Sequence, residues 1–158
     1  FLANHCIAHY FGGMPERKYK IVHLDDEFNL GVSVCTELRG AGYEAYYIPS
    51  KREGLQLIRR YHPDLIISDI RSPEMDGFEF LKILKADPAT AKISFIFLTA
   101  GSDIKTAQTA LKLGADDFVS KPFDHVELLR IIRSVLENKL KSDEHINHRS
   151  QSTEAAPT

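Results

Sequence analysis

Short apolar runs alternate with amphipathic stretches through the middle of the chain, and this alternation restricts the possible folds more than any other feature. Runs rich in β-branched and aromatic residues predict five strands, at 20–24, 43–48, 65–68, 93–98 and 118–120. After each strand, apolar residues recur mostly at intervals of three or four, as on the buried face of a helix. In chain order, the apolar residues of the five predicted helices are Leu30, Val34 and Leu38; Leu55 and Ile58; Phe78, Leu81 and Leu84; Ile104, Ala107, Ala110 and Leu111; and Leu128, Ile131, Ile132, Val135 and Leu136. The chain is therefore predicted to have an α/β fold of (βα)5 order.

Regular βα alternation with short connections predicts one parallel sheet with helices on both faces, because crossovers between parallel strands are right-handed. This doubly wound domain is expected from about residue 18 to residue 140. The third and fourth strands are the most apolar and should lie at the centre, whereas the tyrosine-rich second strand suits an edge. Ligands of such sheets bind beyond the carboxyl ends of the strands, so a functional site is expected there.

Composition excludes several classes of protein. Of the 158 residues, 43% are hydrophobic and 27% are charged, which is the balance of a folded globular chain rather than a disordered one. The formal net charge is −2, so no general excess of positive charge indicates binding to nucleic acid or an anionic membrane. No apolar run approaches the roughly 18 residues that a membrane-spanning helix needs. Cys6 and Cys35 are too few for a disulfide framework, and a cytoplasmic location is expected.

The two ends differ in composition from the middle. Residues 1–17 are apolar at first and then pass through Gly12 and Gly13, which suggests an added leader or an upstream linker. Residues 141–158 are nearly all polar or small, and we expect them to form a polar tail or linker. The predicted organisation is therefore one domain at 18–140 between two flanking segments.

Polar side chains follow four of the predicted strands. Asp25 and Asp26 follow the first, Asp69 the third, Thr99 the fourth and Lys121 the fifth. Carboxylates that meet at one sheet edge repel each other, and a hard divalent cation with oxygen ligands relieves the repulsion at least cost. Mg²⁺ suits such a site because it takes one or two protein carboxylates together with phosphate oxygens. The residues therefore indicate phosphoryl transfer as the class of reaction.

The same residues stand in motifs that resemble the receiver domain of two-component response regulators, over about residues 18–140. The resemblance implies the flavodoxin-like strand order 2-1-3-4-5. The motifs that carry it are Ile21-Val22-His23-Leu24-Asp25-Asp26-Glu27, Pro63-Asp64-Leu65-Ile66-Ile67-Ser68-Asp69, Pro73-Glu74-Met75-Asp76-Gly77, Thr99-Ala100 and Gly114-Ala115-Asp116-Asp117-Phe118-Val119-Ser120-Lys121-Pro122-Phe123.

The resemblance implies a phosphoacceptor signalling domain rather than an enzyme that turns over a separate substrate. Asp69 would accept a phosphoryl group from a sensor histidine kinase or a histidine phosphotransfer protein, with self-catalysed transfer and later autodephosphorylation. Asp26, Asp69 and the backbone carbonyl of Arg71 would bind Mg²⁺ or Mn²⁺, and Asp25 would order a metal-bound water.

The resemblance also implies how the phosphate is read. Lys121 would pair with the phosphoryl oxygens, and the Thr99 hydroxyl would donate to them and draw the following loop inward. Phe118 would act as the aromatic switch residue. Phosphorylation would then change the surface formed by the fourth helix, the fifth strand and the fifth helix.

Other interpretations of the sequence are weaker. A haloacid-type phosphatase needs a second aspartate two residues after the nucleophile, where this chain has Arg71. A binding-only pseudo-receiver usually lacks one of the acidic, acceptor or lysine residues, and all are present. The segment after the last helix is too short for a DNA-binding domain, although the parent protein could carry an effector domain. Ala107 and Ile131 stand where related receivers carry arginines that pair subunits, so a monomer or a weak phosphorylation-dependent dimer is expected.

Overall fold

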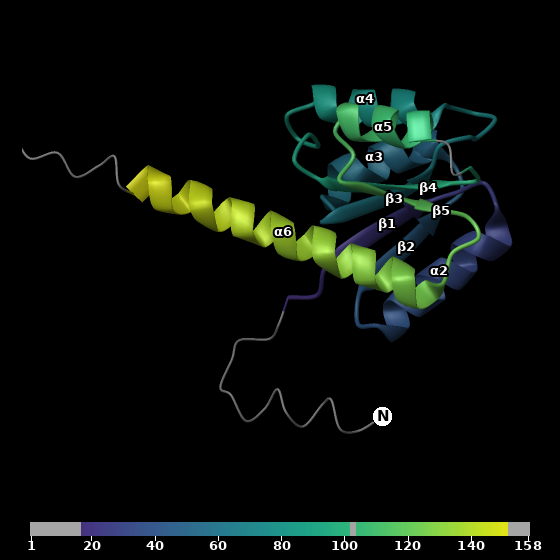
Figure 1. Cartoon of the computed structure of the whole chain (residues 1–158), viewed down its shortest axis with the longest axis horizontal. Helices are drawn as coiled ribbons and strands as arrows, with labels where there is room; N and C mark the ends of the chain where they lie inside the picture. Colours follow the sequence, from purple (N-terminus) through teal and green to yellow (C-terminus); the bar gives the residue numbers. More distant parts are fainter. Residues whose placement is uncertain (1–16, 102–103, 152–158) are drawn as a thin grey trace, which may run out of the picture.

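The computed structural model describes residues 17–101 and 104–151, with the side chains of the last four described residues left out (Figure 1). The predicted leader at 1–17 lies outside the described residues except for Arg17, and the same is true of the end of the predicted tail, 152–158. Both stay predictions.

The described residues form a five-stranded parallel sheet of order β2-β1-β3-β4-β5, which confirms the predicted fold and strand order (Figure 1). All five strands of the sequence prediction are present, with ends shifted by at most one residue. The strands are β1 (Lys20–Leu24), β2 (Glu44–Ile48), β3 (Leu65–Asp69), β4 (Ser94–Thr99) and β5 (Asp117–Ser120). Every residue of β3 and β4 is buried, as the predicted central position requires, and β2 lies at an edge.

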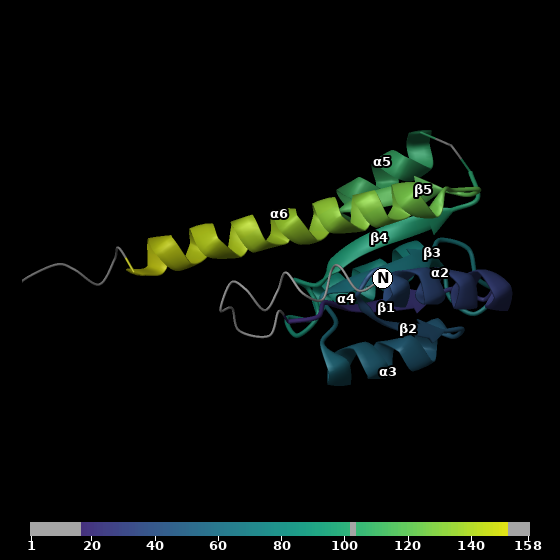
Figure 2. The same cartoon turned by 90° about the horizontal axis from the view of Figure 1, so that it is seen from below.

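Helices cover both faces of this sheet (Figures 1 and 2). They are α2 (Phe28–Gly40), α3 (Lys51–Tyr61), α4 (Gly77–Ala86), α5 (Ile104–Lys112) and α6 (His125–Gln151). On one face, α2 and α6 bury Val34, Leu38 and Ile132 against the sheet. On the other face, α3 and α4 bury Ile58 and Phe80 in a second cluster, to which α5 contributes Ala110. Among the residues that the structure describes, no helix is long and apolar enough to cross a membrane.

Helix α6 continues beyond the sheet, as Figure 1 shows. The residues from Lys141 to Gln151, which we expected to belong to a polar tail, are helical. This stretch contains no glycine or proline, and its polar side chains are compatible with an exposed helix. The Ser142 hydroxyl donates to the backbone carbonyl of Asn138, 3.1 Å away, and so stays with its own helix. Polarity therefore predicted the exposure of this segment but not its conformation. The boundary at residue 140 stays a prediction.

Candidate functional site

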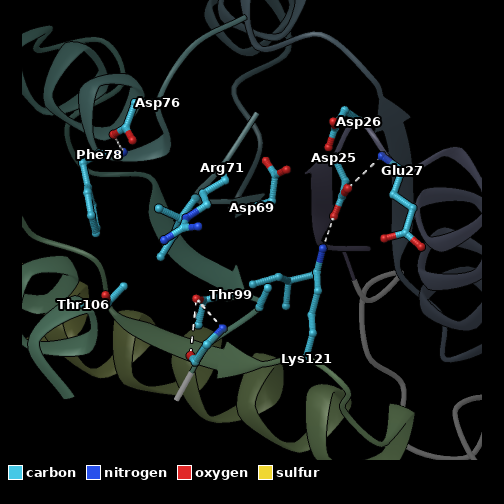
Figure 3. Close-up of a pocket in the computed structure, with 14 residues that line it drawn as sticks. Asp25, Asp26, Glu27, Asp69, Arg71, Asp76, Phe78, Thr99, Thr106 and Lys121 are labelled. Atoms are coloured by element: carbon cyan, nitrogen blue, oxygen red, sulfur yellow. Dashed lines mark hydrogen bonds and ion pairs between the residues drawn. The ribbon is translucent and has the colours of Figure 1, made fainter. Parts of the chain in front are cut away.

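A pocket lies at the carboxyl edge of the sheet, where β1, β3, β4 and β5 end (Figure 3). Its lining contains every residue that the sequence analysis assigned to phosphate or metal binding: Asp25, Asp26, Asp69, Arg71, Thr99 and Lys121. Phe118, the predicted switch residue, does not line the pocket; it is half-buried and packs against the core cluster beneath α3, α4 and α5. The strand order explains this convergence, because parallel strands bring their carboxyl ends to one edge.

Three carboxylates form the centre of the pocket. Asp25, Asp26 and Asp69 each offer an oxygen, and these atoms lie within 4.8 Å of one another. Asp25 and Asp69 are 1% and 5% exposed, whereas Asp26 is exposed. Three hard oxygen donors so close together fit a divalent cation such as Mg²⁺, which would also lower their mutual repulsion.

Lys121 approaches this cluster from β5. Its Nζ lies 2.9 Å from Oδ2 of Asp25, and the other oxygen of Asp25 accepts a hydrogen bond from the backbone N–H of Glu27 at 2.9 Å (Figure 3). Both carboxylate oxygens of Asp25 therefore have a partner in the ligand-free protein. The Lys121 side chain is 22% exposed, so its ammonium group is accessible from the pocket.

A second lysine reaches the cluster from a place that the sequence analysis missed. Lys51 is the first residue of α3 and is 2% exposed, and its Nζ lies 2.5 Å from Oδ1 of Asp69. The predicted site contained polar residues that follow the first, third, fourth and fifth strands, and none that follows the second. Because β2 ends at the same sheet edge, Lys51, three residues after Ile48, could have been found by the same argument.

Asp69 is perturbed by its surroundings. Burial raises the pKa of its carboxyl from the ordinary 3.8 to about 6, against the opposing hydrogen bond and charge of Lys51, and the charge of Asp25 raises the pKa further. In the metal-free protein, the carboxylate form is therefore lost as the pH falls through about 6. Burial outweighs the lysine because a carboxylate loses most of its water at this site.

Thr99 ends β4 at the edge of the pocket. Its hydroxyl accepts a hydrogen bond from the backbone N–H of Gly101 at 3.3 Å, and lies 3.4 Å from the carbonyl oxygen of the same residue (Figure 3). The hydroxyl therefore contacts the loop that follows β4. A new acceptor in the pocket would compete with this loop for the Thr99 proton.

The loop from β3 to α4 carries Arg71 along the pocket and is held close to the strand end. The backbone N–H of Gly77 donates to the carbonyl of Ile70 at 2.6 Å. A Cβ at Gly77 would lie 2.6 Å from the carbonyl oxygen of Asp69, so this close approach requires glycine. Asp76 caps α4 by accepting from the backbone N–H groups of Phe78 and Glu79 at 2.8 and 3.3 Å.

Beneath the pocket, His23 on β1 is fully buried. Its Nε2 lies 3.8 Å from Oδ2 of Asp25, and neither ring nitrogen makes a well-aligned hydrogen bond within the described part of the chain, although the backbone of Gly31 lies close enough to favour the charged ring. Burial lowers the pKa of this imidazole from 6.5 to about 4, partly offset by the charge of Asp25, and Lys121 lowers it further. The neutral ring is therefore the stable form at neutral pH.

Tyr47 on β2 packs beside His23, next to the acidic pair. Its hydroxyl donates to the backbone carbonyl of Asp25 at 2.9 Å, and its ring lies against that of Phe28. The ring occupies the space above Gly31, where a Cβ would lie 2.1 Å from the tyrosine Cε2. The backbone of the acidic pair is therefore fixed by a tyrosine that needs a glycine on α2.

Comparison with known proteins identifies the family of this site. The family described as response regulator receiver domain matches residues 21–133. A response regulator structure from Chloroflexus aurantiacus has a TM-score of 0.73 at 31% identity, covering 77% of this chain and 99% of that one. The chemotaxis response regulator CheY4 of Vibrio cholerae has a TM-score of 0.72 at 29% identity, covering 75% of this chain and 99% of that one.

Relatives in sequence are longer proteins. The probable transcriptional regulator ycf27 of Porphyridium aerugineum is 35% identical over 131 residues, which are 83% of this chain and 53% of that protein. The regulatory protein AtoC of Escherichia coli is 35% identical over 135 residues, which are 85% of this chain and 29% of that protein. The chain thus spans about half of the first relative and less of the second. With the five parallel strands, the acidic cluster and Lys121 at one sheet edge, these matches show that the chain belongs to the response regulator receiver family of two-component signalling.

Proposed function

We propose that Asp69 is the phosphoacceptor of this receiver. One oxygen of its carboxylate attacks the phosphorus atom of a phosphohistidine on a sensor histidine kinase or a histidine phosphotransfer protein. An O–P bond forms as the N–P bond breaks, the electron pair of the broken bond returns to the donor imidazole, and the product is an aspartyl phosphate. Asp69 is suited to this because it ends the central strand β3 and faces the pocket.

One observation carries this proposal: three carboxylates with oxygens within 4.8 Å of one another share a pocket with a lysine 2.9 Å from one of them. Such a cluster is electrostatically costly without a ligand that supplies positive charge. Positioning and charge neutralisation are also the main requirements of phosphoryl transfer.

The residues around Asp69 have distinct proposed roles. Asp26, Asp69 and the backbone carbonyl of Arg71 would hold Mg²⁺ or Mn²⁺, and Asp25 would orient a water on the metal. When bound, the cation supplies positive charge that offsets the charge of the transferred phosphoryl group. Lys121 would pair with the phosphoryl oxygens, since its ammonium lies at the pocket beside Asp25.

The acceptor is tested by labelling with acetyl phosphate and Mg²⁺ and by locating the added mass in peptides. We expect the label on Asp69 and its loss in Asp69→Asn. Asp76→Asn is the matched control, since it removes a second carboxylate from the same pocket while an asparagine can still cap α4. A label that persists in Asp69→Asn, or that is found on Asp25 or Asp76, contradicts the assignment.

The output is proposed to be a change at the surface of α5, β5 and α6. A phosphoryl group that accepts the Thr99 proton would draw in the loop now bonded to that hydroxyl, and the vacated space would let the Phe118 ring turn inward. The half-buried position of Phe118, next to the site but outside its lining, suits such a role.

The switch is tested by hydrogen exchange with and without beryllofluoride, a mimic of the phosphoryl group. Exchange should change mainly across residues 99–125, with little change in α3. Thr99→Ala should weaken this response while Asp69 still accepts phosphate, whereas Thr99→Ser, which keeps the hydroxyl, should retain it. Equal exchange over 99–125 in the two states would refute the switch even if Asp69 is phosphorylated.

We propose that the chain acts in the cytoplasm as a signalling domain that is itself phosphorylated, rather than as an enzyme that turns over a separate substrate. It would be a monomer or a weak dimer that forms on phosphorylation. An effector domain or a downstream protein would receive the signal. The greater length of the relatives supports an effector in the parent protein.

A further inference from the structure

Asp69 contacts two different environments. Toward the pocket it faces Asp25, Asp26 and the space in which a phosphoryl group would lie. Its Oδ1 is bonded to Lys51, which is 2% exposed and is not part of the pocket lining. The two lysines of the site therefore differ: Lys121 is accessible from the pocket, whereas Lys51 reaches the acceptor from the protein interior.

The position of Lys51 is fixed by its neighbours in sequence. The Ser50 hydroxyl accepts from the backbone N–H of Glu53 and donates to the Glu74 carboxylate, with 2.8 Å to Oε2. Arg52 Nε lies 3.6 Å from Oε1 of the same glutamate. Glu74 belongs to the loop from β3 to α4, so the start of α3 is tied to the loop that follows the acceptor. Lys51 lies between these two contacts.

This placement is unfavourable for a lysine unless it has a partner. An ammonium group at the N-terminus of a helix opposes the helix dipole, and burial adds a large desolvation cost. The Asp69 carboxylate compensates both, and removing either charge leaves the other buried without its partner. The cost of burying the Lys51 ammonium therefore depends on the charge of Asp69, and the cost of burying the Asp69 carboxylate depends on the charge of Lys51.

We propose that Lys51 is a positioning residue that stabilises the Asp69 carboxylate as the leaving group of the aspartyl phosphate and thereby shortens the lifetime of that phosphate. This inference rests on the proposed function of Asp69. In hydrolysis, a water oxygen attacks the phosphorus atom, the bond between phosphorus and Asp69 oxygen breaks, and its electron pair remains on the carboxylate. The water gives up its proton to the departing phosphate or to solvent, and inorganic phosphate is released.

Charge on the Asp69 carboxyl group changes during this step. In the acyl phosphate the aspartyl part carries no formal charge, and after cleavage it carries a full negative charge. The Lys51 ammonium bonded to this carboxyl group therefore stabilises the products more than it stabilises the acyl phosphate. The transition state, in which part of the negative charge has developed, receives part of this stabilisation. Because Lys51 is buried and bonded to Asp69, whereas Lys121 is accessible from the pocket, we assign the carboxylate to Lys51 and the phosphoryl oxygens to Lys121.

The test compares phosphate lifetimes at pH 8 with saturating Mg²⁺, after labelling with acetyl phosphate and removal of the donor. Lys51→Met keeps the side-chain stem and removes the charge. A hydrogen bond to a charged group contributes about 1.5–3 kcal/mol, and if roughly half of it develops in the transition state, the half-life should lengthen by a factor of about 4 to 13. Arg60→Gln is the matched control, since it removes a positive charge from an exposed residue at the other end of the same helix, and its half-life should stay that of the wild type.

Two further measurements keep the test decisive. Lys51→Gln retains a neutral donor for Asp69, so it should fold even if Lys51→Met does not, and its half-life should lie between those of the wild type and Lys51→Met. In the unphosphorylated protein, loss of the Lys51 ammonium should also tighten Mn²⁺ binding about threefold or more. The affinity is measured by adding Mn²⁺ and following its paramagnetic effect on the NMR signals.

An unchanged or shorter half-life in folded Lys51→Met or Lys51→Gln overturns the inference, and so does unchanged Mn²⁺ affinity. These outcomes differ from a failure of the proposed function, in which wild-type Asp69 itself would take up no phosphate.

Discussion

The buried histidine beneath the acidic pair predicts a specific dependence of stability on pH. His23 has a pKa of about 4 in the folded protein and an ordinary value of 6.5, which we take for the unfolded chain. As the pH falls, the unfolded chain therefore binds a proton before the folded one, and stability is lost between pH 6.5 and about 4. From these values the loss is about 2 kcal/mol between pH 8 and pH 5, and about 3 kcal/mol by pH 4.

His23→Val should remove this dependence, because valine suits a buried strand and does not titrate. The assay is urea unfolding in EDTA at pH 8, 7, 6 and 5, with the difference in unfolding free energy between wild type and variant plotted against pH. Asp69 acts in the opposite direction, since its raised pKa makes the folded state bind a proton first below about pH 6. That contribution is common to both proteins and cancels in the difference.

A matched control distinguishes the loss of the buried His23 from the loss of an exposed histidine. His62 is exposed and has a φ of 47°, a conformation that asparagine tolerates, so His62→Asn removes an imidazole without straining the backbone. Because the His62 side chain is already exposed in the folded protein, this variant should not reproduce the pH slope expected of His23→Val. If the wild type and His23→Val lose stability in parallel from pH 8 to pH 5, the reasoning from burial of His23 is refuted.

Two other substitutions test the charge cluster and the core. Asp26→Ala should raise the thermal midpoint of the metal-free protein in calorimetry, because it relieves repulsion from Asp25 and Asp69. The same substitution should remove most of the Mg²⁺ affinity measured by titration, and unchanged affinity would reject the metal site. Phe97→Ala should cost about 3–5 kcal/mol in urea unfolding, because the fully buried ring packs against Phe95 and Phe78 with centroid distances of 4.7 and 5.4 Å; a loss below about 1 kcal/mol would contradict this packing.

The sequence predicted the sheet well because its signals are local. Runs such as Ile66–Ile67 in β3 are apolar on both faces, and the structure confirms that a central strand explains them. The convergence of Asp25, Asp69 and Lys121 followed from topology alone, since each directly follows or ends a parallel strand. Prediction of the pocket therefore needed no distance information.

What the sequence did not reveal depends on contacts between distant elements. Lys51 follows β2 at the same sheet edge, so the strand order could have placed it near the site, but only its 2.5 Å approach to Asp69 shows which carboxylate it contacts. The raised pKa of Asp69 likewise depends on burial, which the identity of the residue does not encode. Helix α6 was truncated in the prediction because a polar composition is equally compatible with a tail and with an exposed helix.

The contact between Tyr47 and Gly31 restricts the order in which substitutions at these two positions can accumulate. With any side chain at position 31, the Cβ would lie 2.1 Å from the tyrosine ring, so the ring at 47 would have to leave its present position. Glycine at 31, in contrast, tolerates smaller residues at 47, at the cost of a less stable helix. Of the two single-step routes that lead to this pair, the one in which glycine is acquired first avoids an intermediate in which the ring and a Cβ at position 31 compete for the same space. The two positions should therefore be strongly epistatic, and substitution of Gly31 should be disfavoured for as long as Tyr47 is present.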